Sequence, residues 1–390
     1  MKQNAFGLRG PLILYAPESR KQDWEIDNNE KSSFNLQICT IDLPGRHVCG
    51  ITCSLTIAVD TIAAPLLAIT LPIVQMINRS RLFSFKLVPT YRLRLINVAV
   101  LAPVIFSIDD HGFPSELINS LTLNAGHRYD IVIETENPSG QEAIGPYWMR
   151  AVGLYGLPWT RGTAATAGKG FTYEGLAIVS YKTDYGVEPT SEMQQELTTI
   201  DEVEFTPLSR VVLSQMASDC AILLFKMEDG LGYFSIDGDD FHTFQHPSEA
   251  PLFSIANGLT NEELHKIEYG EHIEVVLVSI KDEQHPFHMH SHAPLVVGSG
   301  VVSLKQIRDN QLPPLQLEDS MTRDVYTVPP CTPDGPDGCL DAGYLVLRFT
   351  ADSPGVWIFH CHIDWHLKAG LSMILVEAKR NYKSRGLNPF

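Results

Sequence analysis

Residues 354–370, PGVWIFHCHIDWHLKAG, decide the fold because they place three histidines around one cysteine in a single short stretch. His360, Cys361, His362 and His366 all lie within seven positions. A structural cysteine needs no imidazoles beside it, whereas a thiolate flanked by imidazoles is a ligand set that suits a soft transition metal. The stretch therefore predicts a metal site that is carried by a β-strand.

A second histidine cluster, HPFHMHSH, occupies residues 285–292. Alternate side chains of a strand share one face, so His288, His290 and His292 are expected to point to the same side. His285 lies an odd number of positions away and is expected to face the other side. The cluster therefore predicts ligands on both faces of one strand.

The same alternation applies to the HCH motif, in which Cys361 faces away from the histidine on either side of it. Two strands of this kind, lying side by side, would form two metal sites back to back. One site would contain His285 and Cys361, and His366, which lies beyond the strand, is expected to return to this side. The other site would contain four imidazoles, those of His288, His290, His360 and His362.

The ligand types favour copper over zinc. Structural zinc sites commonly use cysteine pairs with CxxC spacing, and the sequence contains no such pair. Two imidazoles and one thiolate match a trigonal blue-copper site whose axial ligand is weak or absent. The remaining histidines are expected to have ordinary surface or core roles; they are His47, His111, His127, His242, His246, His265 and His272.

Short runs rich in Val, Ile, Leu and Tyr recur along the chain between turn residues, a pattern typical of β-sandwiches and barrels. We expect strands at 91–100, 121–136, 174–182, 210–215, 272–280, 294–304, 344–352 and 371–378. Helical periodicity is scarce, so the predicted fold class is all-β. A chain of 390 residues is long for one core. The polar, acidic stretch 183–207 is the expected linker between two β-sandwich domains.

The composition argues against nucleic acids and membranes as binding partners. The formal net charge is −17, without a basic cluster, and such a surface repels nucleic acid and anionic membranes. The longest apolar tract, 51–77, is long enough to cross a bilayer, but its β-branched runs are broken by Pro65 and Pro72 and favour buried strands. The first residues contain no secretory leader with a charged and then an apolar region. We expect neither nucleic-acid binding nor a membrane anchor.

The chain contains seven cysteines, an odd number that leaves one thiol unpaired if the others form bridges. Cys361 is the expected free thiol because the metal site requires it. Cys331 and Cys339 bracket the loop CTPDGPDGC, and we expect a local disulfide between them.

The motifs HPFHMHSH and HCHIDWHLKAGL resemble the two C-terminal copper signatures of the multicopper oxidases, most closely those of the fungal laccase-like and ferroxidase branch. GLRGPLILYAP resembles the end of that family's first cupredoxin domain, and YRLRLINVAVLAPVIFSIDDH resembles its middle domain. The resemblance implies two cupredoxin-like Greek-key sandwiches. The expected boundaries are 1–20 for a remnant of the first domain, 21–182 for the middle domain, 183–207 for the linker and 208–390 for the C-terminal copper domain.

The resemblance also implies a role for each ligand. A type 1 copper would be bound by His285, Cys361 and His366, and Leu371 would occupy the axial position without coordinating. Cys361 and His366 would be the catalytic residues, since electrons from the substrate would enter at His366 and leave through Cys361. A type 2 copper would be bound by His288. The ligands of a type 3 copper pair would be His290, His360 and His362.

The implied activity is the oxidation of a small reducing substrate, a phenol or aromatic amine, coupled to the reduction of dioxygen to water. Complete members of the family carry further HxH motifs in their first domain, and no HxH motif precedes His285 here. We therefore expect only a partial type 2/type 3 copper cluster, and a truncated and impaired laccase-like oxidase. Two alternatives remain open: an iron(II) ferroxidase, and a copper-binding or electron-transfer protein without oxygen reduction. The family resemblance implies a secreted, extracellular protein.

Overall fold

The computed structural model describes part of the 390-residue chain. The described residues are 32–37, 54–61, 76–77, 80–84, 90–99, 103–109, 118–134, 146–153, 174–180, 188–192, 197–207, 217, 219–228, 231–237, 239–244, 264–334 and 338–378. The expected remnant at 1–20 and the expected strand at 210–215 lie outside these residues.

The chain divides into two compact units, one made of residues 1–156 and 160–200 and the other of 157–159 and 201–390. The carbonyl of Thr198 accepts hydrogen bonds from the backbone N–H groups of Asn119 and Ser120, both in the first unit. The division after residue 200 falls within 183–207, and the exact domain boundaries stay a prediction.

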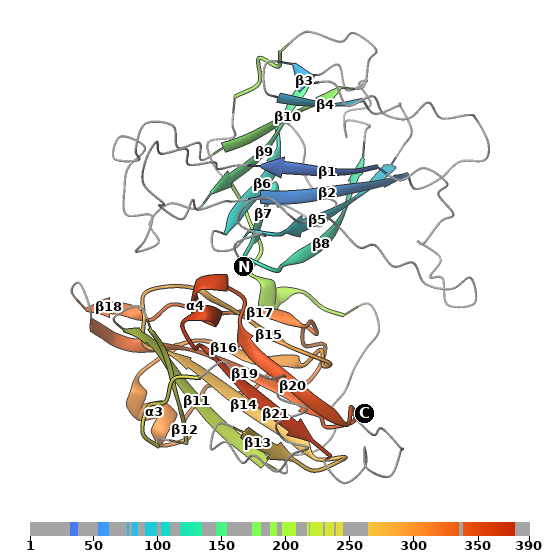
Figure 1. Ribbon diagram of the computed structural model, residues 1–390. Coiled ribbons are helices and arrows are strands. Elements are labelled where there is room, and N and C mark those ends of the chain that lie inside the picture. Colours follow the sequence, from blue (N-terminus) through green and yellow to red (C-terminus); the bar gives the residue numbers. More distant parts are fainter. Residues whose placement is uncertain are drawn as a thin grey trace, which may run out of the picture. The chain divides into compact units, whose positions relative to one another are not determined.

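The first unit consists of two sheets. One has the strand order β1-β2-β5-β8 and the other has the order β3-β4-β10-β9-β6-β7 (Figure 1). Its strands are β1 (Ser32–Gln37), β2 (Ser54–Thr61), β3 (Met76–Ile77), β4 (Ser80–Ser84), β5 (Thr90–Asn97), β6 (Val104–Ile108), β7 (Ser120–Leu123), β8 (Arg128–Glu134), β9 (Tyr147–Gly153) and β10 (Glu174–Ser180).

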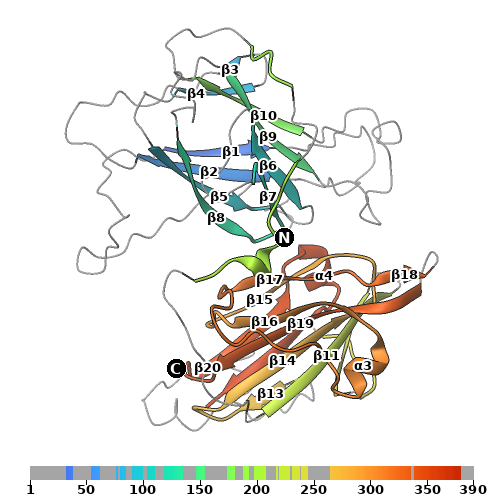
Figure 2. The ribbon, with the colours of Figure 1, turned by 180° about the vertical axis from the view of Figure 1, so that it is seen from behind.

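The second unit also consists of two sheets, seen from both sides in Figures 1 and 2. Its strands are β11 (Asp219–Glu228), β12 (Leu231–Ile236), β13 (Leu264–Ile267), β14 (His272–Ser279), β15 (His285–Met289), β16 (Leu295–Val302), β17 (Val325–Val328), β18 (Thr332–Asp334), β19 (Gly338–Thr350), β20 (Gly355–Cys361) and β21 (Ser372–Glu377). Its helices are the 3₁₀ turn η3 (Glu202–Glu204), α3 (Leu304–Arg308) and α4 (Asp364–Lys368).

The strand order of the second unit brings the two histidine clusters together. One sheet has the order β12-β11-β14-β19-β16, and the other has the order β13-β21-β20-β15-β17. β11 and β14 are parallel neighbours, as are β13 and β21, so the chain must cross between the sheets rather than close simple hairpins. The second sheet sets β20 beside β15, and these strands carry the two motifs.

Seven of the eight expected strands coincide with strands of the structure, and the eighth lies outside the described residues. The expected strand at 121–136 is divided into β7 and β8 by a turn at Gly126, whose φ of 82° favours glycine. The fold class is all-β, as the sequence predicts. No helix of the described residues is both long and apolar enough to cross a membrane.

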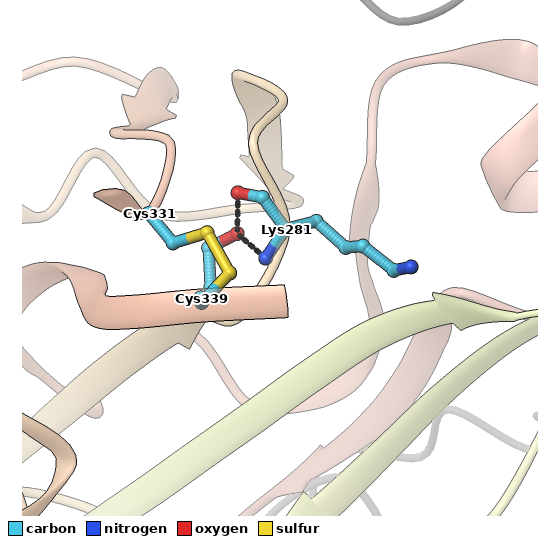
Figure 3. The surroundings of a disulfide bond; sticks show 4 residues. Lys281, Cys331 and Cys339 are labelled. Carbon is cyan, nitrogen blue, oxygen red and sulfur yellow. Dashed lines mark hydrogen bonds between the residues drawn. A yellow bond between two sulfur atoms is a disulfide. The ribbon is translucent and has the colours of Figure 1, made fainter. Parts of the chain in front are cut away.

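The expected disulfide between Cys331 and Cys339 is present, with a Cα–Cα distance of 5.8 Å. The bridge lies beside Lys281 (Figure 3), whose carbonyl accepts a hydrogen bond of 2.8 Å from the backbone N–H of Cys331. The Lys281 backbone also lies within 3.4 Å of the Ser279 hydroxyl. The disulfide loop therefore holds the backbone that leads directly into His285, the first residue of β15.

Candidate metal centre

His285, Cys361 and His366 converge in the interior of the second unit. The sulfur of Cys361, the last residue of β20, lies 3.8 Å from Nδ1 of His285 and 3.6 Å from Nδ1 of His366. Helix α4 follows β20 directly and returns His366 to the cysteine side. All three side chains are buried, and their potential ligand atoms lie within 4.8 Å of one another. The structure thus brings together the three residues that the sequence proposes for one site.

These distances fit a trigonal metal ion. Bonds of about 2.0 Å to nitrogen and about 2.3 Å to sulfur, spread at about 120°, separate the nitrogen and sulfur atoms by about 3.7 Å. The two observed separations lie on either side of this value. Two imidazoles and one cysteine thiolate are also the donor set of blue-copper sites.

Burial keeps the three groups in their neutral forms before a metal binds. It lowers the pKa of His366 to about 4, and burial together with the nearby His366 and Lys281 lowers the pKa of His285 well below its usual value. Burial raises the pKa of the Cys361 thiol. The imidazole lone pairs are therefore available, while a metal ion must displace the thiol proton to bind sulfur.

The surroundings of the site are aromatic on one side and acidic on another. The ring of Phe225 from β11 packs edge-on against His285, with 4.9 Å between the centroids, and it lies equally close to Phe287. A carboxylate oxygen of Glu283 lies 3.9 Å from Nε2 of His366. Glu283 was not predicted from the sequence. Its position two residues before the HPFHMHSH motif is the feature that could have indicated it.

Leu371 is linked by its backbone to two of the three candidate ligands. Its carbonyl accepts the N–H of Cys361 at 3.1 Å, and its own N–H donates to the carbonyl of His366 at 2.9 Å. The side chain is buried and offers no donor atom. Leu371 therefore borders the site without supplying a ligand.

On the opposite face of the same strands, four imidazoles form a second cluster. His288 of β15 pairs in register with His360 of β20, and Nε2 of His290 lies 3.3 Å from Nε2 of His360. The ring centroids of His288 and His362 are 5.8 Å apart. The two-faced arrangement expected from strand alternation is confirmed for these residues.

Backbone carbonyls orient two of these rings. Nδ1 of His288 lies 2.8 Å from the carbonyl of Asp324, and Nδ1 of His360 lies 2.8 Å from the carbonyl of Cys361. A ring whose Nδ1–H is engaged presents Nε2 as its ligand atom. Burial lowers the pKa of His360 to about 3 and also lowers the pKa of His290, so both rings are neutral.

His292 does not join this cluster, and the expectation that it shares a strand face with His288 and His290 is wrong. Strand β15 ends at Met289, and Ser291 has a φ of 70°, so the alternation of side chains stops before His292. Its Nε2 lies instead 2.6 Å from a carboxylate oxygen of Glu377.

The other histidines lie apart from both clusters or outside the described residues. His127 is buried in the first unit, His242 is exposed, and Nδ1 of His272 lies 3.0 Å from the hydroxyl of Thr350. His265 belongs to β13. His47, His111 and His246 lie outside the part of the chain that the structure describes.

A β-sandwich with a buried two-histidine, one-cysteine centre defines the class of cupredoxin-like proteins. One sequence model described as multicopper oxidase matches residues 233–381, and a second with the same description matches residues 78–182. The chain belongs to the multicopper oxidase family, a family of copper-dependent oxidoreductases. Its resident metal is accordingly copper, and the His285, Cys361 and His366 group is consistent with a type 1 site.

Curated relatives include proteins named as iron transport multicopper oxidases and proteins named as laccases. The chain is 25% identical to "Iron transport multicopper oxidase fio1" of Schizosaccharomyces pombe over 74% of this chain and 46% of the relative. It is 27% identical to "Laccase-5" of Trametes versicolor over 74% of this chain and 53% of the relative. It thus spans about half the length of these relatives.

Solved structures support the fold. Fet3p, described as a multicopper oxidase that functions in iron import, matches 78% of this chain and 59% of its own, with a TM-score of 0.62 and 20% identity. The laccase from Botrytis aclada matches 79% and 58%, with a TM-score of 0.56 and 21% identity. These likenesses confirm the cupredoxin-like sandwich fold expected for the chain.

Proposed function

We propose that His285, Cys361 and His366 bind a type 1 copper that accepts electrons from a small reducing substrate. The observation that carries this proposal is the convergence of two Nδ1 atoms on the Cys361 sulfur at 3.8 and 3.6 Å. Leu371 would border the copper on its axial side, and its buried side chain would offer no donor atom there. Copper supplies one-electron redox chemistry when it is bound.

The opposite cluster is proposed to supply a partial ligand set for the copper ions that would meet dioxygen, so oxygen reduction is proposed to be impaired. His288 is the proposed ligand of a type 2 copper. The proposed ligands of the type 3 pair are His290, His360 and His362. Cys361 lies between two of these histidines in sequence, so a single peptide unit on each side connects the two sites covalently. The in-register pairing of His288 with His360 holds this connection in the sheet.

The proposed substrate is a phenol or an aromatic amine, with dioxygen as the electron acceptor. The laccases among the relatives support this choice. His366 is the proposed point of electron entry because it lies on α4, outside the strands that carry the other ligands. We further propose that the protein acts outside the cell.

An iron(II) oxidase is the second candidate, and Glu283 favours it. Its carboxylate lies 3.9 Å from Nε2 of His366, where it can attract a cationic reductant to the proposed entry point. The relatives named as iron transport multicopper oxidases support the same reading.

Anaerobic single-turnover kinetics separate the two candidates. The copper-loaded chain is mixed with a phenol or with iron(II), and the bleaching of its blue absorption is followed. We expect phenol to bleach the site faster than iron(II), and Glu283→Gln to leave the phenol rate within about twofold. Faster bleaching by iron(II) that falls in Glu283→Gln would instead establish the ferroxidase. If oxygen does not restore the colour, the protein is instead an electron-transfer protein that does not reduce oxygen.

Replacing Leu371 with methionine is expected to lower the reduction potential of the type 1 copper. A thioether in the axial position donates to Cu(II) and stabilises the oxidised state, and potentials of such sites follow the axial ligand. Redox titration measures the change. Leu375→Met is the matched control, because Leu375 is buried in β21 beyond the site. An unchanged or higher potential in Leu371→Met would show that Leu371 is not axial.

A further inference from the structure

The backbone of residues 369–371, between α4 and β21, is held by the opposite sheet of the same unit. The backbone N–H of Gly232 in β12 donates to the carbonyl of Ala369 at 3.0 Å, and the hydroxyl of Thr243 donates to the same carbonyl at 3.2 Å. The N–H of Phe244 donates to the carbonyl of Gly370 at 3.1 Å. We call Gly232, Thr243 and Phe244 the 369–371 clamp.

The clamp is shaped by a bridge between β12 and the segment that follows it. Phe234 and His242 exchange two backbone hydrogen bonds of 2.8 Å. This pairing turns the chain back, so that Thr243 and Phe244 lie near the same part of the 369–371 backbone as Gly232. Two elements that are distant from the copper motifs in sequence therefore hold one short segment.

Neither side of the contact between the clamp and residues 369–371 has room for an added side chain. A Cβ atom at Gly232 would lie 2.7 Å from both Cβ and N of Leu371. A Cβ atom at Gly370, whose φ is 105°, would lie 2.2 Å from the hydroxyl oxygen of Thr243. Such separations are well inside van der Waals contact, and the atoms at Leu371 are backbone and Cβ, which cannot rotate away. An alanine at 232 must therefore displace Leu371 or the strand itself.

A displacement of Leu371 would shift two of the proposed copper ligands, because Leu371 is hydrogen-bonded to both. Its carbonyl holds the N–H of Cys361, and its N–H is held by the carbonyl of His366. We propose that Gly232 is a positioning residue that sets where Leu371 stands at the axial side of the site, and thereby tunes the geometry of the Cys361 and His366 ligands. This inference rests on the proposed type 1 site.

The test compares Gly232→Ala with Gly298→Ala. Gly298 lies in β16, and a Cβ atom there would lie 3.0 Å from Cδ2 of Leu315 and 3.3 Å from Cγ2 of Val346. This variant therefore adds the same methyl group at a tight position that is away from the site. In the copper-free protein we expect faster amide hydrogen exchange at Cys361 and Leu371 in Gly232→Ala alone. In the copper-loaded protein we expect its thiolate-to-copper absorption and reduction potential to shift, with both unchanged in Gly298→Ala.

A third variant keeps the proposal testable if Gly232→Ala does not fold. Thr243→Val removes the hydroxyl bond to Ala369 without adding bulk, and we expect smaller shifts of the same kind. If Gly232→Ala behaves like Gly298→Ala in exchange and in absorption, the clamp has no positioning role. A colourless wild-type protein would overturn the type 1 assignment and the axial role of Leu371, whereas the exchange rates would still decide whether Gly232 holds residues 369–371.

Discussion

The Cys361→Ser variant, loaded with copper, is expected to lose the entire thiolate-to-copper charge-transfer absorption. Only a sulfur ligand produces this transition, and Cys361 is the only described thiol within reach of both His285 and His366. The sandwich is expected to remain folded, because serine is close to cysteine in size. The backbone N–H of residue 361 donates to the carbonyl of Leu371, and its carbonyl accepts from Nδ1 of His360, so neither hydrogen bond involves the side chain. Absorption and far-ultraviolet circular dichroism measure the two effects.

Cys220→Ser is the matched control, since Cys220 and Cys361 are the two free cysteines among the described residues. Cys220 is exposed at the start of β11, where its sulfur lies 3.5 Å from a carboxylate oxygen of Glu274. Although residue 220 is exposed as a whole, its thiol is partly desolvated by its neighbours. This desolvation and the Glu274 carboxylate raise the pKa of the thiol to about 11, which makes it a poor metal ligand at neutral pH. We expect this variant to keep its full colour. A colourless wild-type protein with Cys361 reduced would refute the copper assignment.

The two-faced arrangement of the ligands could be predicted because strand alternation is a local rule. Once two strands are neighbours, side chains of odd and even positions separate without further information. The register that pairs Phe287 with Cys361 and His288 with His360 realises this separation. The sequence also indicated that His366 returns to the cysteine side, because it lies five residues beyond Cys361 and outside the strand.

The residues that support the ligands could not be predicted, because their contacts join segments that are far apart in the chain. Asp324 holds His288 through a backbone carbonyl, which any residue type possesses, so no sequence signal marks it. Gly232 meets Leu371 only because β12 belongs to the opposite sheet. The prediction that His292 shares a strand face with His288 was wrong for a local reason. The strand ends at Met289, and nothing in the sequence HMHSH indicates the positive φ of Ser291.

Glu377 explains where His292 goes instead. This carboxylate is buried at the end of β21; one oxygen lies 2.6 Å from Nε2 of His292, and the other accepts the backbone N–H of Ser353 at 2.5 Å. Trp357 donates its ring N–H to the carbonyl of the same Ser353 at 2.8 Å, and the hydroxyls of Ser291 and Ser353 are also bonded. The carboxylate therefore joins the end of the HPFHMHSH motif to the turn that precedes β20.

Replacing Glu377 with alanine is expected to destabilise the second unit by about 2–6 kcal/mol, because two groups lose a buried hydrogen-bond partner and each such loss costs about 1–3 kcal/mol. The imidazole of His292 and the N–H of Ser353 would both lose their buried acceptor. Urea unfolding of the copper-free protein measures the loss. Asp352→Asn is the control, because Asp352 lies 3.9 Å from Nδ1 of His292 but is 70% exposed, and we expect a change of less than about 0.5 kcal/mol. A loss below about 1 kcal/mol in Glu377→Ala would mean that water replaces the carboxylate and that the pair does not hold the motif in place.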